Sequence, residues 1–309
     1  MKARKIEQKS FAHELIINFS KKRKIIPSKF HYDLKGSKYF EKITKTKEYY
    51  VARVEKEILN KISGQINKIF GNNLTFVEFG SGSAEKIRIL INKKVKFYVP
   101  LDISFDFINE SSKKLLKSFP NLKIIPTHCD YTKYIKLPKS ISKTKIGFFL
   151  GSSIGNFYNK EEKKFLKNAK KILGEKSFLF VGVDLMKNEK ILKKAYNDKG
   201  NFTAKFNLNL INIINKQVKT NLKVKNFKYI STFNYKKNSI ENFIVSKKDQ
   251  IFFIKQKKFI FKKGDKIQTE ISNKFTISRF NKLAKSSGWS VKKHWKDAKR
   301  YYAVFLLEA

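Results

Sequence analysis

One short stretch constrains the fold of this chain more than any other part of its sequence. An apolar run that carries an acid near its end, Phe76-Val-Glu-Phe79, leads into Gly80-Ser-Gly82 and then into a helix-like segment. A backbone that passes close to a nucleotide-like ligand needs residues without a Cβ atom, and such loops occur at the exit of a buried strand. The stretch therefore predicts a strand followed by a ligand-binding loop.

Strand-like and helix-like segments alternate after this loop. The expected strands are 74–79, 96–101, 122–126, 145–150 and 177–183, and the expected helices are 84–92, 106–117 and 159–173. Strands separated by helices specify a parallel sheet with right-handed crossovers. An amphipathic helix over 54–70 precedes the first strand, because apolar residues recur there at helical spacing. The pattern predicts a doubly wound, Rossmann-like α/β domain.

The region after residue 187 follows a different pattern. A helical piece at 192–218 comes before shorter β-rich runs at 227–235, 239–246 and 256–261, which are typical of an antiparallel sheet. The tail returns to the first pattern, with a helix at 276–287 and strands at 290–295 and 301–307. We therefore expect a Rossmann-like domain made of 61–186 and 276–309, and an α+β lobe made of 1–60 and 187–275.

The chain is strongly basic, with 69 Lys and Arg against 25 Asp and Glu and a formal charge of +44. Such an excess, taken alone, suggests a polyanionic partner such as nucleic acid. Lys, Ile, Asn, Phe and Tyr are abundant from end to end, however, so the charge reflects a chain-wide bias more than a patch built for binding. We expect a solvated basic surface, no nucleic-acid partner and a monomeric chain.

Cysteine and histidine are rare. Cys129 is the only cysteine, so no internal disulfide can form and nothing calls for an oxidising compartment. The four histidines are not spaced with cysteine or carboxylates as a metal site requires. No apolar run approaches the ~20 residues of a membrane-spanning helix, and the N-terminus is too polar for a signal peptide. We expect a cytoplasmic protein without a metal or a membrane contact.

The loop at Gly80 departs from the dinucleotide-binding pattern, because Glu85 stands where that pattern has its third glycine. A Gly-x-Gly loop alone serves NAD, FAD and S-adenosylmethionine (SAM) alike. The next strand ends at Asp102, where a carboxylate can accept hydrogen bonds from both ribose hydroxyls of an adenosine. The alternative role of Asp102 is a helix cap. Together the missing glycine and Asp102 favour SAM over NAD.

Polar residues follow the later strands as well. Asp130 and Tyr131 come after the third strand, where an acid and an aromatic ring could hold an adenine; a solvated turn with a core tyrosine is equally compatible. Asn156 follows the fourth strand. It faces the substrate side, because ligands of open α/β sheets lie beyond the carboxyl ends of the strands. The alternative role of Asn156 is a cap of the next helix.

Several motifs, taken in order, closely resemble the histidine Nα-methyltransferases of ergothioneine biosynthesis, which are SAM-dependent class I methyltransferases. The motifs are Tyr32-Asp-Leu-Lys-Gly-Ser37, Phe40-Glu-Lys-Ile-Thr44, Glu48-Tyr-Tyr50, Glu78-Phe-Gly-Ser-Gly82, Glu85-Lys86, Gly151-Ser-Ser-Ile-Gly-Asn156, Gly182-Val-Asp-Leu185, Ala195-Tyr196, Phe206-Asn-Leu-Asn209 and Thr269-Glu-Ile-Ser272. Such enzymes transfer three methyl groups in succession from SAM to the α-amine of free L-histidine, giving hercynine. The resemblance implies this activity, with histidine as the small-molecule substrate and SAM as the co-substrate.

The resemblance also implies site residues. For the methyl donor it implies Gly80, Lys86, Asp102, Asp130 and Tyr131. For the histidine it implies Tyr32 and Tyr196 near the carboxylate, Asn156 at the α-amine, and Tyr49, Glu270 and Ser272 around the imidazole. Asn156 and Tyr32 would carry the catalytic role. They would position the amine while its proton leaves through water, since an ammonium cannot attack.

The chain departs from the family pattern at three positions. Lys47 replaces a usual proline, Ala52 replaces a usual threonine, and Asn242 stands where relatives place an apolar residue beside the substrate side chain. These departures leave fine specificity open, so methylation of another amino acid or small amine is an alternative. An RNA or DNA methyltransferase is less favoured, because the segment that ends at Asn156 lacks the Asn/Asp-Pro-Pro-Tyr/Phe motif of enzymes that methylate base amines.

Overall fold

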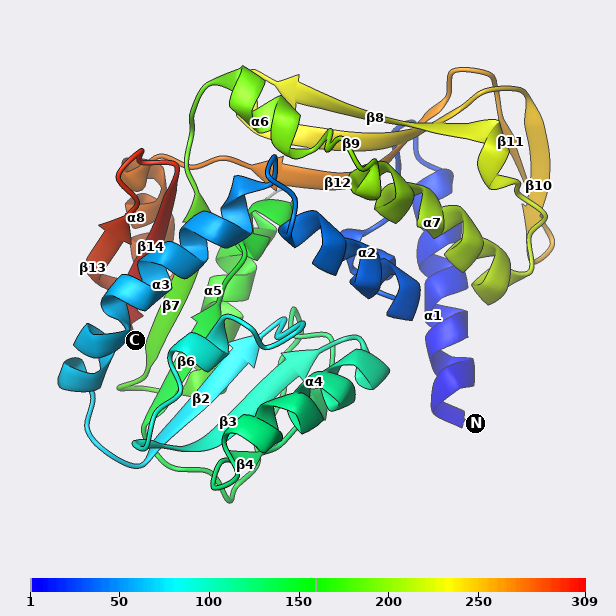
Figure 1. Cartoon of the computed structure of the whole chain (residues 1–309). Coiled ribbons are helices and arrows are strands. Elements are labelled where there is room, and N and C mark those ends of the chain that lie inside the picture. Colours follow the sequence, from blue (N-terminus) through cyan, green and yellow to red (C-terminus); the bar gives the residue numbers. More distant parts are fainter. Residues whose placement is uncertain (1, 159) are drawn as a thin grey trace. The chain divides into compact units, whose positions relative to one another are not determined.

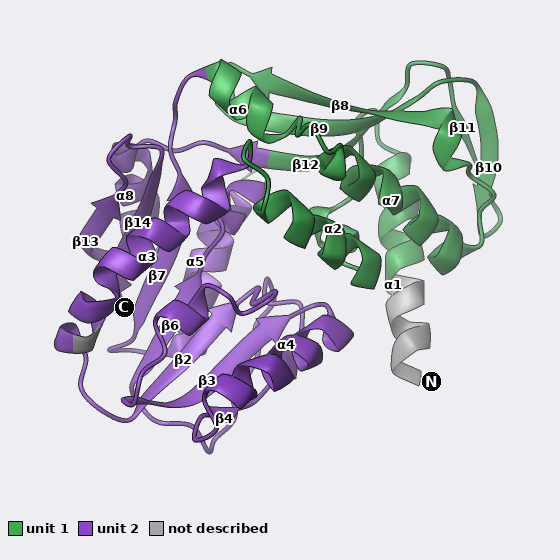
Figure 2. Cartoon of the chain, in the orientation of Figure 1, with its two compact units in different colours: residues 1–48, 189–271 green, residues 49–188, 272–309 purple. Residues whose placement is uncertain are grey.

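The computed structural model describes residues 2–158 and 160–309. It divides into two compact units (Figure 2). Unit 1 contains the chain up to Glu48 together with Glu189–Ile271, and unit 2 contains Tyr49–Asn188 together with Ser272–Ala309. The functional division expected above, into a cofactor-binding domain and a substrate-binding lobe, stays a prediction.

Unit 2 is built on an eight-stranded sheet of order β13-β14-β7-β6-β2-β3-β4, with β5 paired to β3 off this path (Figure 1). The strands are β2 (Leu74–Phe79), β3 (Val95–Asp102), β4 (Lys123–Ile124), β5 (Thr127–His128), β6 (Lys145–Phe149), β7 (Phe178–Asp184), β13 (Ser290–Lys296) and β14 (Tyr302–Glu308). The strands from β4 to β7 pair in parallel, whereas β14 is antiparallel to both its neighbours. The predicted parallel α/β sheet is confirmed. The strand expected at 122–126 is shortened to the two residues of β4, and β5 follows outside that range.

Both faces of this sheet are buried. On one face, Val77, Phe79 and Phe149 share a core with Phe165 of α5 (Glu161–Leu173) and Phe280 of α8 (Ile277–Ser286). The alternate residues Phe76, Phe148 and Phe180 lie on the opposite face, where Phe148 and Phe180 stack at 5.3 Å. Figure 1 shows α3 (Tyr50–Ile69) and α4 (Phe105–Ser118) in front of the sheet and α5 and α8 behind it. Coverage of both faces explains why β2 is a continuous buried run.

The prediction of a helix at 84–92 is wrong. Only a short 3-10 helix, η2 (Ile87–Ile89), forms there. Ala84 has φ 58°, in the left-handed region, so an α-helix cannot begin at this residue. Ile87, Leu90 and Ile91 are nevertheless buried. Their helical spacing therefore reflects a single buried turn, which is too short a segment to distinguish from a helix by periodicity.

The single helix expected at 192–218 is also wrong, because two helices, α6 (Glu189–Ala195) and α7 (Phe202–Val218), occupy this region. Asp198 breaks the pattern. Its carboxylate accepts hydrogen bonds from the backbone N–H groups of Phe202 at 2.7 Å and Thr203 at 2.8 Å. Asn201 has φ 53° and ends the turn. A carboxylate that satisfies the first N–H groups of a helix fixes where that helix starts.

Unit 1 contains a four-stranded sheet of order β1-β12-β9-β8 and a separate hairpin, β10-β11. The strands are β1 (Lys24–Ile25), β8 (Phe227–Asn234), β9 (Ser239–Ser246), β10 (Gln250–Ile254), β11 (Lys257–Phe261) and β12 (Lys266–Asn273), whose last two residues belong to unit 2. Of the runs expected to form one antiparallel sheet, those at 227–235 and 239–246 pair as β8 and β9, whereas the run at 256–261 is β11 and pairs with β10 in the separate hairpin. β12 was not predicted, because its buried positions include Gln268, Thr269 and Ser272, which show no apolar alternation.

Helices α1 (Lys2–Phe19) and α2 (Leu34–Thr44) complete unit 1. Leu15 and Phe19 of α1 share a core with Leu210 of α7 and with the hairpin residues Phe252 and Phe261. The pattern of the first 30 residues did not reveal α1. Among the described residues, no helix has the length and apolar character needed to cross a bilayer.

The start of α2 is fixed by its cap residue. Oδ1 of Asp33 accepts a hydrogen bond from the backbone N–H of Gly36 at 2.7 Å. A Cβ atom on Gly36 would lie 1.8 Å from the carbonyl oxygen of His31, so this turn requires glycine. The turn places Tyr32 directly ahead of the helix.

Candidate active site

The candidate cofactor loop follows β2. Gly80 and Gly82 have φ of 72° and 52°, in the left-handed region that favours glycine. The backbone N–H of Gly80 donates to the carbonyl oxygen of Leu101 at 2.8 Å, which holds the loop against β3. A Cβ atom on Gly80 would lie 3.4 Å from the ring of Tyr131. The loop is thus suited to a ligand that approaches the main chain closely.

Asp102 ends β3 beside this loop. Its Oδ2 accepts from the backbone N–H of Gly82 at 3.0 Å, and its Oδ1 accepts from that of Ser104 at 2.9 Å. Burial raises the pKa of Asp102 above its ordinary value, although these backbone hydrogen bonds act in the opposite direction. The cap residue of α4 is Ser104, not Asp102. Because a carboxylate oxygen can accept more than one hydrogen bond, the two fixed oxygens suit the two hydroxyls of a ribose.

Glu78, the acid ahead of the first glycine, is buried below the loop. Its Oε2 accepts a hydrogen bond from the hydroxyl of Tyr98 at 2.5 Å. Burial raises the pKa of Glu78 to about 8, against the opposing effects of the Tyr98 hydrogen bond and the Lys86 charge. The carboxyl group therefore keeps its proton at neutral pH, so it joins β2 to β3 through Tyr98 without adding a second charge near Asp102.

Asp130 and Tyr131 follow β5. Oδ1 of Asp130 accepts hydrogen bonds from the backbone N–H and the hydroxyl of Thr132, at 3.1 and 2.5 Å, which forms a local turn. The ring of Tyr131 packs edge-on against Phe149, with centroids 5.8 Å apart, and against Phe165 at 6.0 Å. Since the same ring lies against Gly80, the structure brings Tyr131 to the cofactor loop. Turn formation and core packing are thus compatible with a role in binding.

Lys86 contacts a buried acid that sequence reasoning missed. Its Nζ lies 2.8 Å from Oε2 of Glu55 on α3, whose side chain is fully buried. Glu55 also accepts from the backbone N–H of Gly151 at 2.8 Å and from the hydroxyl of Tyr302 at 2.6 Å. A Cβ atom on Gly182 would lie 2.0 Å from Oε1 of Glu55. Glu55 therefore ties Lys86 to the loop after β6, and the absence of a side chain at Gly182 is the signal that could have revealed it.

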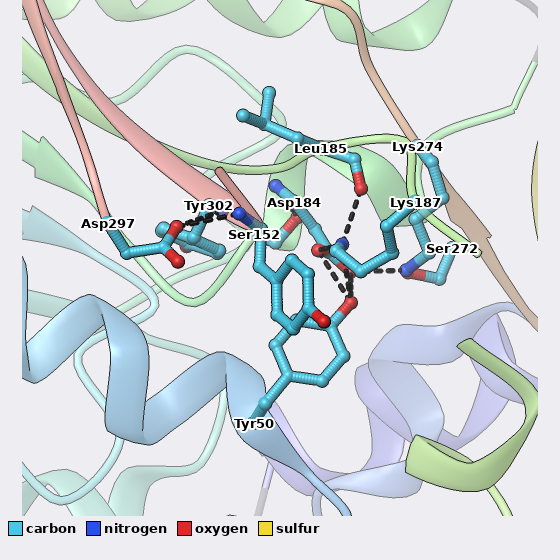
Figure 3. A network of polar contacts seen from close by, with 10 residues as sticks. Tyr50, Ser152, Asp184, Leu185, Lys187, Ser272, Lys274, Asp297 and Tyr302 are labelled. Atoms are coloured by element: carbon cyan, nitrogen blue, oxygen red, sulfur yellow. Dashed lines mark hydrogen bonds and ion pairs between the residues drawn. The ribbon is translucent and has the colours of Figure 1, made fainter. Parts of the chain in front are cut away.

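A buried polar network surrounds Asp184 at the carboxyl end of β7 (Figure 3). Asp184 accepts from the Tyr50 hydroxyl at 2.8 and 2.9 Å, from Nζ of Lys187 at 2.5 Å and from Nζ of Lys274 at 2.7 Å. Lys187 also donates to the Tyr50 hydroxyl at 2.6 Å and to the carbonyl oxygen of Leu185. Two lysines thus share one buried carboxylate.

The charged groups in this network shift one another's pKa values. Burial alone would raise the pKa of Asp184, but the charges and hydrogen bonds of Lys274 and Lys187 outweigh burial and hold that pKa below its ordinary value. Burial lowers the pKa of Lys187 to about 8, although Asp184 acts in the opposite direction. Asp184 is therefore ionised at neutral pH. Neither lysine was singled out from the sequence: Lys274 is 90 positions from Asp184, and Lys187, although only three positions away, is one of many lysines in the chain.

Three of the predicted substrate residues belong to unit 2. Tyr49 directly precedes α3 and is buried. Ser272 is buried on β12, where its Oγ lies 2.7 Å from Nζ of Lys274. Asn156 ends the 3-10 helix η3 (Ser153–Asn156) and is half-buried. It does not cap α5, whose cap residue is Lys160.

The loop that carries Asn156 is tied to β12. The side-chain amide of Asn273 donates to the carbonyl oxygen of Gly155 at 3.0 Å and to that of Phe157 at 2.9 Å. A Cβ atom on Gly155 would lie 2.8 Å from the carbonyl oxygen of Asn273. The two segments therefore approach each other at main-chain distance, which brings Asn156 to the part of β12 that carries Ser272.

The other substrate candidates belong to unit 1. The ring of Tyr32 packs edge-on against Phe40 and Phe206, with centroids 5.7 and 5.6 Å apart. The carbonyl oxygen of Tyr196 lies 2.9 Å from the hydroxyl of Tyr229.

Glu270 is joined to the same tyrosine. The Tyr229 hydroxyl lies 2.9 Å from Oδ1 of Asn242, and Nδ2 of Asn242 donates to Oε2 of Glu270 at 2.7 Å. Burial raises the pKa of Tyr229 well above its ordinary value, and the charge of Glu270 adds to this effect. Tyr229 therefore stays a neutral phenol that connects Tyr196 with Glu270. No sequence motif pointed to it.

Across the described ranges, no group of three His, Cys, Asp or Glu side chains is arranged as a metal site. A parallel core that carries β14 antiparallel between β7 and β13, together with the Gly80 loop and the half-buried Asp102 carboxylate, defines a SAM-dependent class I methyltransferase. The crystal structure of magnesium protoporphyrin IX methyltransferase from Synechocystis PCC 6803 with bound SAH has a similar fold. The TM-score is 0.50 at 9% identity, and the match covers 90% of this chain and 97% of that chain.

The chain belongs to the family of histidine-specific, SAM-dependent methyltransferases, whose model matches residues 11–309. It is 27% identical to the histidine N-alpha-methyltransferase of Mycobacterium tuberculosis over 282 residues, which cover 89% of this chain and 87% of that protein. It is 31% identical to ergothioneine biosynthesis protein 1 of Neurospora crassa over 196 residues, which cover 60% of this chain and 22% of that protein. The predicted family is confirmed.

Proposed function

We propose that this chain transfers three methyl groups in succession from SAM to the α-amine of free L-histidine, giving hercynine, as a step of ergothioneine biosynthesis. The observation that carries the proposal is the match to the histidine-specific family over residues 11–309, which takes in both compact units. The names of the bacterial and fungal relatives support the same substrate and the same pathway.

In this proposal, unit 2 binds SAM. Bound SAM supplies a methyl group that the positive charge of its sulfonium already activates. Gly80 lets the main chain approach the co-substrate, Asp102 accepts hydrogen bonds from the ribose, and Asp130 and Tyr131 hold the adenine. Lys86, which forms an ion pair with Glu55, is the fifth proposed SAM-binding residue. The left-handed glycines and the carboxylate of Asp102, fixed by backbone hydrogen bonds, support this fit.

The histidine would be recognised at three groups. Tyr32 and Tyr196 donate phenolic hydrogen bonds to its carboxylate, and Asn156 accepts one from its amine. Glu270, Ser272 and Tyr49 surround the imidazole, where a carboxylate can accept from the ring N–H and a hydroxyl can donate to the ring lone pair. An apolar ring would leave these groups unsatisfied, at a cost of about 1–3 kcal/mol for each buried group. That cost is the proposed source of selectivity.

The attacking amine must be neutral, because an ammonium has no lone pair to form the new bond. The α-amino groups of peptides have pKa values of about 7.7–8.0, and the α-amine of a free amino acid has a higher pKa, so the amine has to lose a proton in the site. Asn156 and Tyr32 would hold the nitrogen in line with the transferred methyl group while its proton leaves through water. Repeated transfer also requires room for a bulkier amine at each step.

The proposal further takes the protein to be a cytoplasmic monomer that needs neither a metal nor a nucleic-acid partner. Light scattering of the purified chain tests the assembly state, an assay with a chelator tests the need for a metal, and an assay with nuclease tests the need for nucleic acid. A higher assembly, or activity lost on chelation or on nuclease treatment, would contradict them.

The decisive experiment incubates the purified protein with SAM and a panel of free amino acids, and identifies the products by mass. We expect mono-, di- and trimethylated histidine. If histidine gave no product while another amino acid were trimethylated, the substrate assignment would be wrong and amino-acid methylation would stand. Tight RNA binding with a steep salt dependence, and no methylated amino acid, would favour a nucleic-acid methyltransferase instead.

A further inference from the structure

Ser272 lies on β12, and Lys274 directly follows the end of that strand, two residues further on; both belong to the buried network around Asp184 (Figure 3). Nζ of Lys274 lies 2.7 Å from Oγ of Ser272 and 2.7 Å from Oδ2 of Asp184. The Lys274 side chain is fully buried, and Ser272 is 3% exposed. The lysine thus joins a predicted substrate residue to an ionised carboxylate that solvent does not reach.

The chemistry of this contact fixes the direction of one hydrogen bond. A lysine that faces an ionised carboxylate is an ammonium, which has hydrogens to donate and no lone pair to accept with. In the contact between Lys274 and Ser272, the serine oxygen must therefore be the acceptor. Ser272 cannot donate its hydrogen to Lys274. The hydroxyl hydrogen of Ser272 must therefore point to a different atom, one with a lone pair.

We propose that Lys274 is a positioning residue that sets Ser272 as a hydrogen-bond donor toward the unprotonated ring nitrogen of the substrate. This inference rests on the proposed function. Glu270, which accepts from Asn242, would take the ring N–H. The site would then recognise a neutral ring that carries one N–H and one lone pair. A ring that offers only N–H would have to use the second lone pair of the Ser272 oxygen, and the hydroxyl hydrogen would then not have the ring as its acceptor.

The network can lose Lys274 without leaving Asp184 alone. Lys187 lies 2.5 Å from Oδ1 of Asp184, and the Tyr50 hydroxyl contacts both carboxylate oxygens. Lys274→Met keeps an unbranched side chain and leaves Asp184 paired with Lys187. The matched control is Lys187→Met. It also removes one cation from Asp184, but Lys187 makes no hydrogen bond to Ser272 among the described residues.

The test measures the inhibition constants of two histidine analogues against histidine methylation. Thiazolylalanine carries an acceptor nitrogen without N–H, and pyrrolylalanine carries an N–H without an acceptor. In the wild type, Lys274 occupies one lone pair of the Ser272 oxygen, which favours donation by the hydroxyl over acceptance and therefore favours the thiazole. In Lys274→Met the hydroxyl can turn to accept, so the preference for thiazole over pyrrole should fall by about tenfold, the factor for one hydrogen bond. Lys187→Met should keep the wild-type preference.

Two further variants separate a role in positioning from a role in folding. Ser272→Ala should lower the preference in the same way, and adding Lys274→Met to it should change nothing more. Lys274→Arg keeps a buried donor and should keep the preference, which provides a test even if Lys274→Met does not fold. SAM affinity and the thermal midpoint identify folded variants.

The inference is overturned if folded Lys274→Met keeps the wild-type preference, if Lys187→Met loses it equally, or if Lys274→Arg loses it. A wild-type protein that methylates a different amino acid would instead refute the proposed function, and the mass-spectrometric panel reports that outcome separately.

Discussion

The side-chain amide nitrogen of Asn242 lies 2.7 Å from Oε2 of Glu270, and its amide oxygen lies 2.9 Å from the hydroxyl of Tyr229. Asn242 is fully buried. Because Glu270 can only accept when ionised, the amide must point its nitrogen toward the acid and its oxygen toward the phenol. Asn242, where a departure from the family pattern was expected from the sequence, therefore hydrogen-bonds Glu270 and orients its carboxylate.

Replacing this amide should weaken histidine binding. Asn242→Leu removes the hydrogen bond that orients Glu270, so we expect KM for histidine to rise by about tenfold, with a much smaller change in kcat. Steady-state kinetics at saturating SAM measure both constants. Tyr229→Phe is the matched control, since it removes one hydroxyl and leaves the amide against Glu270. An unchanged KM in Asn242→Leu would show that Glu270 is held without Asn242.

Tyr32 should contribute to the rate. Tyr32→Phe removes the proposed contact to the histidine carboxylate and lets the amine move out of line, so we expect all three transfers to slow by about tenfold or more. Time courses of the three products by mass give each rate. Tyr39→Phe, on a half-buried tyrosine of α2, is the control. Equal rates in wild type and Tyr32→Phe would remove Tyr32 from the catalytic set.

Asp102 should matter for SAM and not for histidine. Asp102→Ala deletes both oxygens that the backbone of Gly82 and Ser104 holds in place, and we expect SAM affinity to fall by about tenfold to a hundredfold. Calorimetric titration with SAM measures this loss. Asp106→Ala, on an exposed acid in the first turn of α4, should bind SAM as the wild type does. Similar losses in both variants would indicate a general charge effect.

Glu78 should make stability depend on pH. Its pKa is raised from 4.5 to about 8 in the fold, so the folded state holds a proton that the unfolded state has lost between these values. Stability from this group is therefore full below pH ~4.5 and falls as pH rises toward ~8, by about 1.4 kcal/mol per pH unit. Glu78→Gln should remove this slope. Denaturant unfolding across this range measures it, and parallel profiles for the two proteins would contradict the prediction.

Gly182 should be intolerant of any side chain. In Gly182→Ala the new Cβ would lie 2.0 Å from Oε1 of Glu55 and 2.3 Å from the Tyr302 hydroxyl, so the buried acid must move. We expect a loss of about 1–3 kcal/mol in unfolding free energy together with weaker SAM binding, because Lys86 loses its partner. Gly64→Ala, where the Cβ would meet nothing within 4 Å, should be neutral or stabilising. Equal stability of the two variants would refute the packing argument.

Sequence reasoning succeeded where neighbouring residues determine structure. The apolar run before Gly80 and the alternation of strands and helices predicted the parallel sheet, and several motifs in order predicted the family. It failed at 84–92, because the left-handed residue Ala84 cannot be recognised from apolar spacing. It failed at β12, because Gln268 and Thr269 are buried polar residues.

The supporting contacts of the candidate site could not be predicted, because they join residues that are far apart in the chain. Glu55 contacts Lys86, which is 31 positions away in the sequence, and Tyr302, which is 247 positions away. Lys274 meets Asp184 across 90 positions. From sequence alone, the charged residues in these contacts cannot be told apart from the many others in a lysine-rich chain. Only the fold shows which of these charges are buried and paired.

The hydroxyl of Tyr229 has a single hydrogen but lies 2.9 Å from each of two acceptors, the carbonyl oxygen of Tyr196 and Oδ1 of Asn242. The two acceptors therefore compete for one hydrogen, and a stronger hydrogen bond to one of them weakens the other. In the proposed function, a substrate ring that hydrogen-bonds Glu270 would also act on Asn242, because these two side chains are hydrogen-bonded to each other. Such a ring would thereby influence the hydrogen bond between the Tyr229 hydroxyl and the backbone at Tyr196.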